Sequence, residues 1–506
     1  MKKTVALVVI DGFGVSNKEI GDATKVAKMP YYKSLVENYP HCLLRASGEF
    51  VGLKKGQMGN SETGHLNIGA GRVVKQDLTI IDDAINNQSF YKNEQLCKLM
   101  EITKQGDNDL HIMGLISNGG IHSHINHLFA TLKLAKEYEI KNVFIHCFTD
   151  GRDTSPTSSV NFVKQIMHEC KKLGVGEIST VVGRFYAMDR EKLYERTLKA
   201  YNLMVNGEGK LSNDLVKSIK ASYENNITDE FLKPIKYKSK TFGTIKPNDS
   251  VIFFNFRKDR AKQITDSLIN KNFIGFKTDF VIKNFLTFSN LGDGLETMVA
   301  FDKKPEKMTL SEVVSLNNMT QAKFAEPTKF PHVTYFLNGG NEKPFKNEDW
   351  FKIPPKKVET FDLAPQMSAI ELAETLRNEV KKDRYDFVMC NLANCDMVGH
   401  TGNFEATVKA CEFVDKSLSI IVDHIKSIGG EVVIVADHGN CEQMIYRNKI
   451  CTTHSNNPVR LILASDKRKN CKLKKGALKD IAPTILELLN INKPNCYTGN
   501  SLIVNL

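Results

Sequence analysis

Short apolar runs rich in β-branched residues recur along this sequence and constrain its fold more than any other feature. We predict buried strands at Val5–Ile10, His111–Ile116, Val143–Phe148, Glu177–Val182, Val251–Phe256, Asp386–Leu392, Glu431–Ala436 and Val459–Ala464. Amphipathic stretches such as Asn126–Tyr138 and Met367–Val380 lie between many of these runs and predict helices. Ser368 is the expected N-cap of the second helix, because Glu371 follows three residues later. This alternation predicts an α/β fold with mostly parallel sheets covered by helices on both faces.

Charged residues follow several of these predicted strands at once. They are Asp11, Asp150, Arg184, Arg257 and Asp437. In parallel α/β sheets, ligands bind at the edge where the strands have their carboxyl ends. We therefore expect the functional groups to gather at that edge.

The composition excludes several classes of protein. The 506 residues carry a formal net charge of +11, but the lysines are scattered and the densest cluster lacks interleaved aromatic residues. This predicts no nucleic-acid partner and suits a small anionic substrate. Eleven cysteines without a CxxC motif argue against a disulfide framework and a zinc ribbon, and they favour the cytoplasm. No run approaches the roughly 20 apolar residues needed to cross a bilayer, so we expect no membrane association.

The length favours two domains. Candidate crossings between them are Lys75–Thr79 and the polar segment Phe301–Thr309. We therefore expect one domain built from residues 1–75 and 310–506, interrupted by an inserted domain of residues 76–309.

Potential metal ligands are split between the two ends of the chain. They are Asp11, Ser61, Asp396, His400, Asp437, His438 and His454. Carboxylates, imidazoles and a serine oxygen can hold two divalent ions around a hydroxyl that accepts a phosphoryl group. Two alternatives stay open, namely that Ser61 only caps a helix and that Asp437 is a helix N-cap. For Asp396 and His400, Gly399 favours a loop over a shared helix face.

Arginines recur in the middle third of the chain, at Arg152, Arg184, Arg190, Arg257 and Arg260. Guanidinium groups bind carboxylate and phosphate through two hydrogen bonds at once. Several of them together predict a small ligand with more than one negative group, although each one taken alone is more typical of a surface ion pair. His122 and His124 would lie on one side of an extended segment, and we interpret His122 as an anion contact rather than a metal ligand.

The chain resembles the cofactor-independent (2,3-bisphosphoglycerate-independent) phosphoglycerate mutases of the alkaline-phosphatase superfamily. The resemblance covers nearly the whole chain and rests on ordered motifs, among them VVIDGFG, QMGNSETGHLNIGAGR, FTDGRDTSP, FFNFRKDRA, NCDMVGHTG and VVIVADHGN. It implies an alkaline-phosphatase-like metal-binding domain interrupted by a transferase-like domain. It also implies a monomer that interconverts 3- and 2-phosphoglycerate through a phosphoserine.

The resemblance implies a site with two Mn²⁺ ions, with Mg²⁺ or Co²⁺ as other possible occupants. One ion would be held by Asp396, His400 and His454, and the other by Asp11, Ser61, Asp437 and His438. Ser61 would be the nucleophile and Asp153 an acid/base group. The implied substrate-binding residues are His122, Arg152, Asp153, Arg184, Arg190, Arg257, Arg260 and Lys329.

Two alternatives remain at this stage. The first is another phosphohydrolase of the same superfamily or a phosphopentomutase, against which the paired arginines argue, since a phosphatase has no need to retain the dephosphorylated alcohol. The second is a non-catalytic binding protein. The intact set of potential ligands argues against it.

Overall fold

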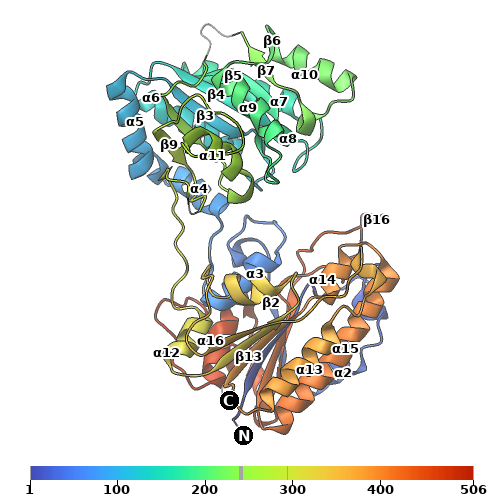
Figure 1. Cartoon of the computed structure of the whole chain (residues 1–506). Coiled ribbons are helices and arrows are strands. Elements are labelled where there is room, and N and C mark those ends of the chain that lie inside the picture. Colours follow the sequence, from blue (N-terminus) through green and yellow to red (C-terminus); the bar gives the residue numbers. More distant parts are fainter. Residues whose placement is uncertain (1, 239–242, 293, 505–506) are drawn as a thin grey trace. The chain divides into compact units, whose positions relative to one another are not determined.

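The computed structural model describes residues 2–238, 243–292 and 294–504 (Figure 1). The chain divides into two compact units, Met1–Gln76 with Lys304–Leu506, and Asp77–Lys303. The sequence-based boundaries after residues 75 and 309 lie one and six residues from these divisions. Each unit is built around its own sheet.

The sheet of the first unit is mostly parallel. Its strand order is β12 (Glu348–Lys352), β11 (Gln321–Ala325), β13 (Phe387–Leu392), β1 (Val5–Ile10), β14 (Glu431–Val435), β17 (Val459–Ala464), β2 (His41–Arg45) and β19 (Gly476–Ala477). The first five strands run parallel, and β17 is antiparallel to both of its neighbours. Val5 lies opposite Phe387 on one side and Glu431 on the other. The first strand of the chain is therefore held between two strands that come from its last quarter.

Helices cover both faces of this sheet. Figure 1 shows α2 (Pro30–Asn38), α13 (Ala369–Val380) and α15 (Phe404–Ser427) on one side, and α12 (Leu310–Leu316) and α16 (Ile481–Leu488) on the other. The other α-helices and strands described in this unit are α1 (Ala23–Val26), α3 (Ser61–Ala70), α14 (Asn394–Gly399) and the short strands β15 (Ile445–Tyr446), β16 (Lys449–Ile450), β18 (Lys472–Leu473) and β20 (Ile503–Val504). Because the central strands are apolar on both faces, they are buried along their whole length.

The second unit repeats this architecture. Its strand order is β10 (Met298–Val299), β9 (Asn284–Thr287), β8 (Ser250–Phe253), β3 (Leu110–Leu115), β4 (Val143–Thr149), β5 (Glu177–Gly183), β7 (Ile235–Tyr237) and β6 (Lys210–Ser212). All neighbouring strands are parallel except β5 and β7. Adjacent residues such as Val181 and Val182 enter different hydrophobic clusters, one on each face of the sheet.

Two sets of helices build those clusters. The first set is α4 (Asp77–Asn86), α5 (Glu94–Gly106), α6 (Ile125–Glu137), α7 (Ser159–Leu173) and α10 (Leu215–Glu224), and the second is α8 (Arg184–Ala187), α9 (Tyr194–Val205) and α11 (Lys262–Ile269). The predicted fold class, two domains of mostly parallel sheet flanked by helices, is confirmed.

Some local expectations were wrong. Asp396 lies in helix α14 and not in a loop, because the helix begins two residues after β13 ends. The prediction of Ser368 as the N-cap residue of α13 is confirmed, but its hydroxyl donates to the Pro354 carbonyl and makes no capping hydrogen bond. Within the described residues, no helix combines the length and apolar character that a membrane crossing requires.

Candidate active site

The carboxyl edge of the first unit's sheet gathers the predicted metal ligands. Asp11 directly follows β1, Asp396 lies in the helix that follows β13, and Asp437 comes two residues after β14. Since β1 lies between the other two strands and runs parallel to both, the three carboxylates meet at one edge. Gly12, at φ +72°, makes the turn after β1, and a Cβ atom there would lie 2.7 Å from the Asp396 Cβ. Only glycine allows this close approach.

Ser61 is the first residue of helix α3. The N-cap is Asn60, whose side chain accepts from the Thr63 backbone N–H at 2.9 Å, so the alternative that Ser61 serves as the cap is wrong. The Ser61 Oγ instead lies 3.1 Å from the Asp11 Oδ1 and 2.9 Å from the His438 Nε2. It is buried at the positive end of a helix, where negative charge is stabilised.

Asp396, His400 and His454 converge on one point. The Asp396 Oδ1 lies 3.2 Å from the Nε2 of each histidine, and the two Nε2 atoms are 3.0 Å apart. Each Nδ1 faces a backbone carbonyl, that of Thr452 for His400 (2.7 Å) and that of Gly59 for His454 (2.8 Å). A carbonyl only accepts, so each Nδ1 donates to it, and this hydrogen bond turns each Nε2 toward the other ring and toward Asp396. Two imidazole nitrogen atoms and a carboxylate oxygen around one point are a donor set that fits a divalent cation.

A second cluster surrounds Ser61. The His438 Nε2 lies 3.4 Å from the Asp11 Oδ1 and 3.6 Å from the Asp437 Oδ2. The other oxygen of Asp437 accepts from the backbone N–H groups of Gly12 and His438, which orients the carboxylate, while its Oδ2 is buried without a hydrogen-bond partner. The alternative that Asp437 caps a helix is wrong, since no helix begins there. Nitrogen and oxygen donors in this arrangement fit a second divalent ion.

Lys329 lies between the two clusters. Its Nζ is 2.7 Å from the Asp11 Oδ1, 2.7 Å from the Ser61 Oγ and 2.6 Å from the Asp396 Oδ2. The resemblance places this lysine among the substrate-binding residues, and the structure brings it into direct contact with the predicted metal ligands. It is the one cation among the described residues that touches both Asp11 and Asp396 at this distance.

The electrostatics of the site follow from burial and opposed charges. Burial disfavours the charged form of Asp11, but the Lys329 ammonium and the hydrogen bond with His438 outweigh it and lower the pKa of Asp11. Burial likewise opposes the charge on Lys329, yet Asp11 and Asp396 raise its pKa. Burial also opposes protonation of His438, but Asp437 and Asp11 raise its pKa to about 9. A metal ion bound to His438 would have to displace that proton.

Glu442 was missed by the sequence analysis, although it lies two residues after the motif VVIVADHGN, which contains Asp437 and His438. Its Oε2 accepts from the backbone N–H groups of Gly14 (2.9 Å) and Asn440 (2.8 Å). Its Oε1 accepts from the Asn457 Nδ2 (2.9 Å) and from the Ser455 hydroxyl. Each of these four residues lies within three positions of a predicted metal ligand. This buried carboxylate therefore ties together the three loops that carry those ligands.

Two asparagines were also missed. The Asn391 Nδ2 donates to the Asp11 Oδ2 at 2.6 Å, and the Asn440 Nδ2 donates to the Asp396 Oδ1 at 2.8 Å. Partners of this kind orient ligating groups. Asn391 is a polar residue inside the otherwise apolar run of β13, and this interruption was the sequence signal that could have identified it.

The arginine cluster belongs to the second unit. Arg184 is buried, and its Nη1 contacts the Asp150 Oδ1 at 2.7 Å and the Asp153 Oδ2 at 2.6 Å. Burial opposes the charge on Arg184, but Asp153 and Asp150 raise its pKa. The Asp150 Oδ1 also accepts from the backbone N–H groups of Arg152 and Asp153. The turn after β4 is thereby locked, with Asp153 facing the guanidinium group.

Asp259 contacts two more arginines of this unit. The Arg190 Nη1 lies 2.7 Å from the Asp259 Oδ2, and the Arg257 Nε lies 3.2 Å from the Asp259 Oδ1. His122 is buried, with its Nδ1 3.9 Å from the Asp259 Oδ1, and neither atom has a hydrogen-bond partner. Burial and then Arg184 lower the pKa of His122 to about 4. A neutral histidine with an unmet hydrogen-bonding atom fits a contact to a polar ligand.

Two further arginines have different partners. The Arg260 Nη1 donates to the Met188 carbonyl at 3.2 Å, and Arg152 lies 3.6 Å from Glu230. Burial and then Arg190 lower the pKa of Arg260. His124 caps helix α6 through its Nδ1, and His122 and His124 form no metal-ligand group among the described residues.

Two comparisons over the full length of the chain decide its family. The chain is 46% identical over 509 residues to the 2,3-bisphosphoglycerate-independent phosphoglycerate mutase of Clostridioides difficile and 48% identical over 506 residues to that of Clostridium acetobutylicum. In both cases 99% of this chain and 99% of the relative are covered. The chain belongs to this family of phosphoglycerate mutases.

Two further comparisons agree with this assignment to the phosphoglycerate mutases. A family model described as the BPG-independent PGAM N-terminus matches residues 81–293, which lie in the second unit. Crystal structures of Leishmania mexicana phosphoglycerate mutase at low cobalt concentration include a chain with 28% sequence identity and a TM-score of 0.74, with 100% of this chain and 98% of that chain covered. The predicted resemblance is confirmed.

Membership makes this phosphoglycerate mutase an isomerase that acts on a small molecule. The alternative of a non-catalytic binding protein is therefore wrong.

Proposed function

We propose that the enzyme interconverts 3-phosphoglycerate and 2-phosphoglycerate through a phosphoserine on Ser61, without bisphosphoglycerate. One observation carries this proposal. The Ser61 Oγ lies within 3.1 Å of Asp11, His438 and Lys329 at the N-terminus of α3. A serine hydroxyl is a weak nucleophile unless its pKa is lowered, and the Lys329 ammonium and the helix N-terminus both favour the alkoxide.

The donor sets fit two divalent ions, and we propose Mn²⁺, with Mg²⁺ or Co²⁺ as substitutes. Their ligands would be Asp396, His400 and His454 for one ion, and Asp11, Ser61, Asp437 and His438 for the other. When bound, the ions would stabilise the Ser61 alkoxide and the charge on the transferring phosphoryl group. The Lys329 ammonium, in contact with both carboxylate clusters, would hold the Ser61 oxygen in its charged form.

Two phosphoryl transfers account for the isomerisation. In the first, a bond forms between the Ser61 Oγ and phosphorus while the bond from phosphorus to the 3-oxygen of the substrate breaks. We propose that Asp153 gives a proton to that oxygen and later takes one from the 2-hydroxyl, which then attacks the phosphoserine. The phosphoryl group returns to glycerate on a different oxygen, so no phosphate is released.

Retention of glycerate separates this reaction from hydrolysis. We propose that His122, Arg152, Asp153, Arg184, Arg190, Arg257 and Arg260 bind the substrate, with Lys329 at the phosphoryl group. The carboxylates that these arginines now contact, Asp153 and Asp259, keep the guanidinium groups ordered. A ligand carboxylate can then bind to an arrangement that is already fixed.

A direct experiment combines product analysis with detection of the intermediate. The full chain is incubated with 3-phosphoglycerate and Mn²⁺ in the absence of bisphosphoglycerate, and 2-phosphoglycerate and inorganic phosphate are both measured. We expect isomerisation without phosphate release, and a phosphorylated Ser61 peptide by mass spectrometry after acid quenching. Phosphate as the main product would favour the phosphohydrolase alternative, and turnover of a pentose 1-phosphate would favour the phosphopentomutase. Turnover by Ser61→Ala would contradict the serine intermediate.

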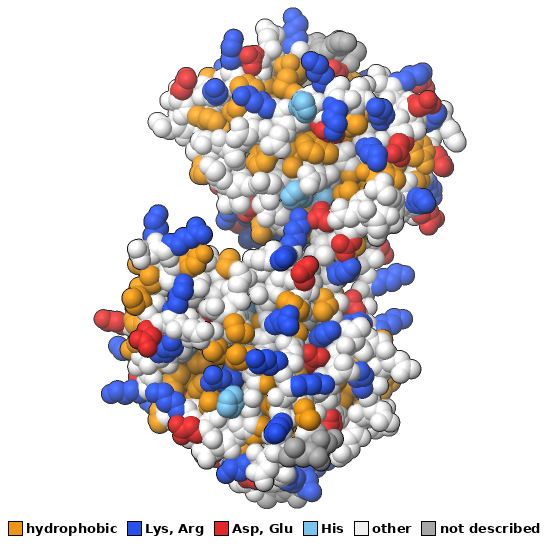
Figure 2. Space-filling view, turned by 180° about the vertical axis from the view of Figure 1, so that it is seen from behind, with side chains coloured by type: hydrophobic (Ala, Val, Ile, Leu, Met, Phe, Trp, Pro, Cys, Tyr) orange, Lys and Arg blue, Asp and Glu red, His pale blue; other side chains and the backbone are white. Residues whose placement is uncertain are grey.

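A monomeric state, a cytoplasmic location and the lack of nucleic-acid or membrane partners stay predictions. On the face shown in Figure 2, Lys and Arg side chains are dispersed among acidic, apolar and uncharged ones. Light scattering coupled to size-exclusion chromatography should give the mass of one chain. A mass of two chains would contradict the monomer.

A further inference from the structure

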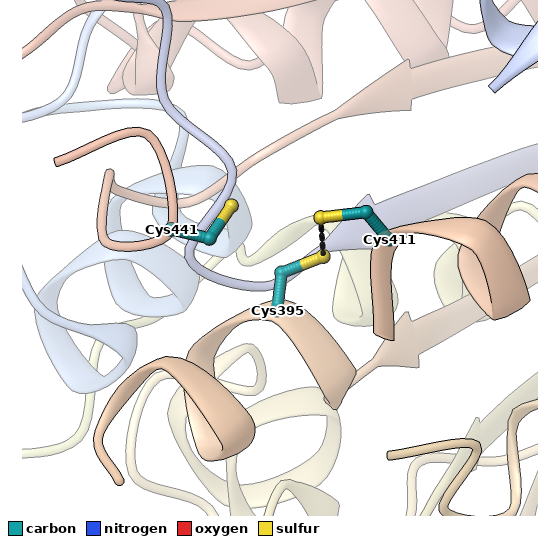
Figure 3. Close-up of side chains that lie close together, drawn as sticks. All are labelled: Cys395, Cys411 and Cys441. Atoms are coloured by element: carbon teal, nitrogen blue, oxygen red, sulfur yellow. Dashed lines mark hydrogen bonds between the residues drawn. The ribbon is translucent and has the colours of Figure 1, made fainter. Parts of the chain in front are cut away.

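Three cysteines from separate segments of the first unit meet in its interior. Cys395 lies in α14, Cys411 in α15, and Cys441 in the loop after β14. All three side chains are fully buried and form no disulfide. Figure 3 shows the Cys395 and Cys411 sulfur atoms facing each other, with the Cys441 sulfur turned toward the same space. The phosphoglycerate mutase reaction proposed above uses none of them.

The geometry of the sulfur atoms suits a single shared ion. The Cys395 and Cys411 Sγ atoms lie 3.7 Å apart, and all three sulfur atoms lie within 4.8 Å of one another. Two sulfur ligands at the usual zinc–sulfur distance in a tetrahedral shell are separated by about 3.8 Å. Cys395 and Cys411 are therefore already spaced as two ligands of one ion, with the Cys441 sulfur close by.

The donor chemistry restricts which ion fits. The group consists of sulfur donors alone, whereas the clusters around Ser61 and His454 contain nitrogen and oxygen donors. Thiolates select soft ions such as Zn²⁺ or Cd²⁺ and discriminate against Mn²⁺ and Mg²⁺. The surroundings belong to the main hydrophobic cluster of the unit, where a divalent ion needs thiolate charge to balance it.

We infer that Cys395, Cys411 and Cys441 form a binding site for one thiophilic divalent cation, separate from the nitrogen and oxygen clusters. Binding converts thiols to thiolates, and each thiolate that forms releases one proton to solvent. Two thiolates neutralise the ion, and the third sulfur completes three-fold coordination.

This site is connected to the catalytic edge through the backbone. Cys395 directly precedes Asp396, and the Cys441 backbone N–H donates to the Gly12 carbonyl at 3.0 Å. An ion that draws the three sulfur atoms together therefore pulls on segments that carry Asp11 and Asp396. We expect occupation of the cysteine site to lower mutase activity even when Mn²⁺ is present in excess.

The test uses Cd²⁺ as the probe on the full chain, without oxygen and after removal of reductant. Excess Mn²⁺ keeps the nitrogen and oxygen clusters filled, and the more exposed Cys496 is replaced by serine in all samples to reduce background. We expect an ultraviolet cadmium–thiolate absorption band that saturates at one ion per chain, together with loss of activity. Removal of a residue that only hydrogen-bonds to a metal ligand typically lowers metal affinity by about tenfold or more. Cys411→Ala removes a ligand itself, so it should weaken Cd²⁺ binding by at least about tenfold.

The matched control is Cys390→Ala, which removes a buried cysteine from β13 of the same unit. It should bind Cd²⁺ as the parent does. Equal bands in the parent and in Cys411→Ala would overturn the inference. X-ray absorption on the parent protein gives an answer that needs no variant: three sulfur neighbours around cadmium support the site, and a shell of oxygen and nitrogen refutes it.

Discussion

The Nε2 atoms of His400 and His454 lie 3.0 Å apart, and each ring is held by its Nδ1 on a backbone carbonyl. Two ring nitrogen atoms at that distance need a proton or a metal cation between them. The backbone thus imposes on both side chains an arrangement that a metal ion stabilises.

Loss of one of these rings should therefore weaken metal binding. We expect His454→Ala to lower Mn²⁺ affinity by at least about tenfold and to reduce the rise in melting temperature that Mn²⁺ produces. Isothermal titration calorimetry and thermal unfolding with and without Mn²⁺ measure the two effects. His424→Ala, a replacement in α15, is the control, and an unchanged Mn²⁺ affinity in His454→Ala would contradict the ligand role.

Lys329→Met should separate stability from catalysis. Removal of the ammonium leaves the buried Asp11 and Asp396 without their cation, so we expect the metal-free variant to lose about 3–5 kcal/mol of stability. Mn²⁺ should restore much of this loss, yet activity should stay about a hundredfold lower or worse, since a charge-stabilising group at Ser61 is missing. The measurements are denaturant unfolding with and without Mn²⁺ and assays of mutase activity. The control variant is Lys343→Met, which replaces an exposed lysine. Equal stabilisation of both variants by Mn²⁺ would be inconsistent with this account.

Glu442→Gln should weaken metal binding because Glu442 holds in place the three loops that carry the predicted metal ligands. The substituted amide would turn N–H groups toward donors that now face a carboxylate, and we expect a stability loss of about 2 kcal/mol. The matched control is Glu431→Gln, another buried carboxylate, at the opposite end of β14, which accepts from Ser465. Both variants should be destabilised, but only Glu442→Gln should lose Mn²⁺ affinity, by about tenfold, and regain activity at high Mn²⁺. Similar Mn²⁺ affinities in the two variants would refute the positioning role.

Lys323 predicts a pH dependence of stability. Its side chain is fully buried in β11, its Nζ has no hydrogen-bond partner, and burial lowers its pKa from 10.5 to about 8. Between those values the unfolded chain binds more protons than the folded one, so the contribution of Lys323 to stability rises with pH. At about 1.4 kcal/mol per pKa unit, Lys323→Met should be more stable than the parent by roughly 3 kcal/mol at pH 7. The advantage should shrink to near zero above pH 10.5.

Urea unfolding of the parent and Lys323→Met across this pH range gives the difference directly. Lys352→Met, on the neighbouring strand β12 and exposed, should show no such trend. A difference that stayed constant with pH would mean that Lys323 does not titrate in this range.

The sequence predicted the central strands well, because a run that is buried on both faces is apolar at every position and ends in a visible change of polarity. Asp11 and Asp437 were placed for the same reason, as charges directly after such runs. His400 and His454 were grouped as potential ligands by residue type, but their assignment to the same ion came only from the resemblance, since no periodicity relates residues 54 positions apart.

Other features depend on contacts that leave no local pattern. Lys329 was assigned to the substrate, but its partners Asp11 and Asp396 lie 318 and 67 residues away. Asn60, rather than Ser61, caps α3, and both residue types are common N-caps, so composition alone could not choose between them. Glu442 was missed because a buried carboxylate with four donors looks, in sequence, like any surface glutamate.

The position of β1 between β13 and β14 also sets an order for synthesis on the ribosome. Residues 77–303 contain all the strands of their own sheet and can complete it while the last two hundred residues are still being made. Strand β1 is synthesised first, so its apolar side chains stay exposed and its backbone stays unpaired until β13 and β14 have been made. Newly made chains therefore contain a finished inserted domain long before they have a catalytic centre, and that waiting strand is where chaperones would be needed most.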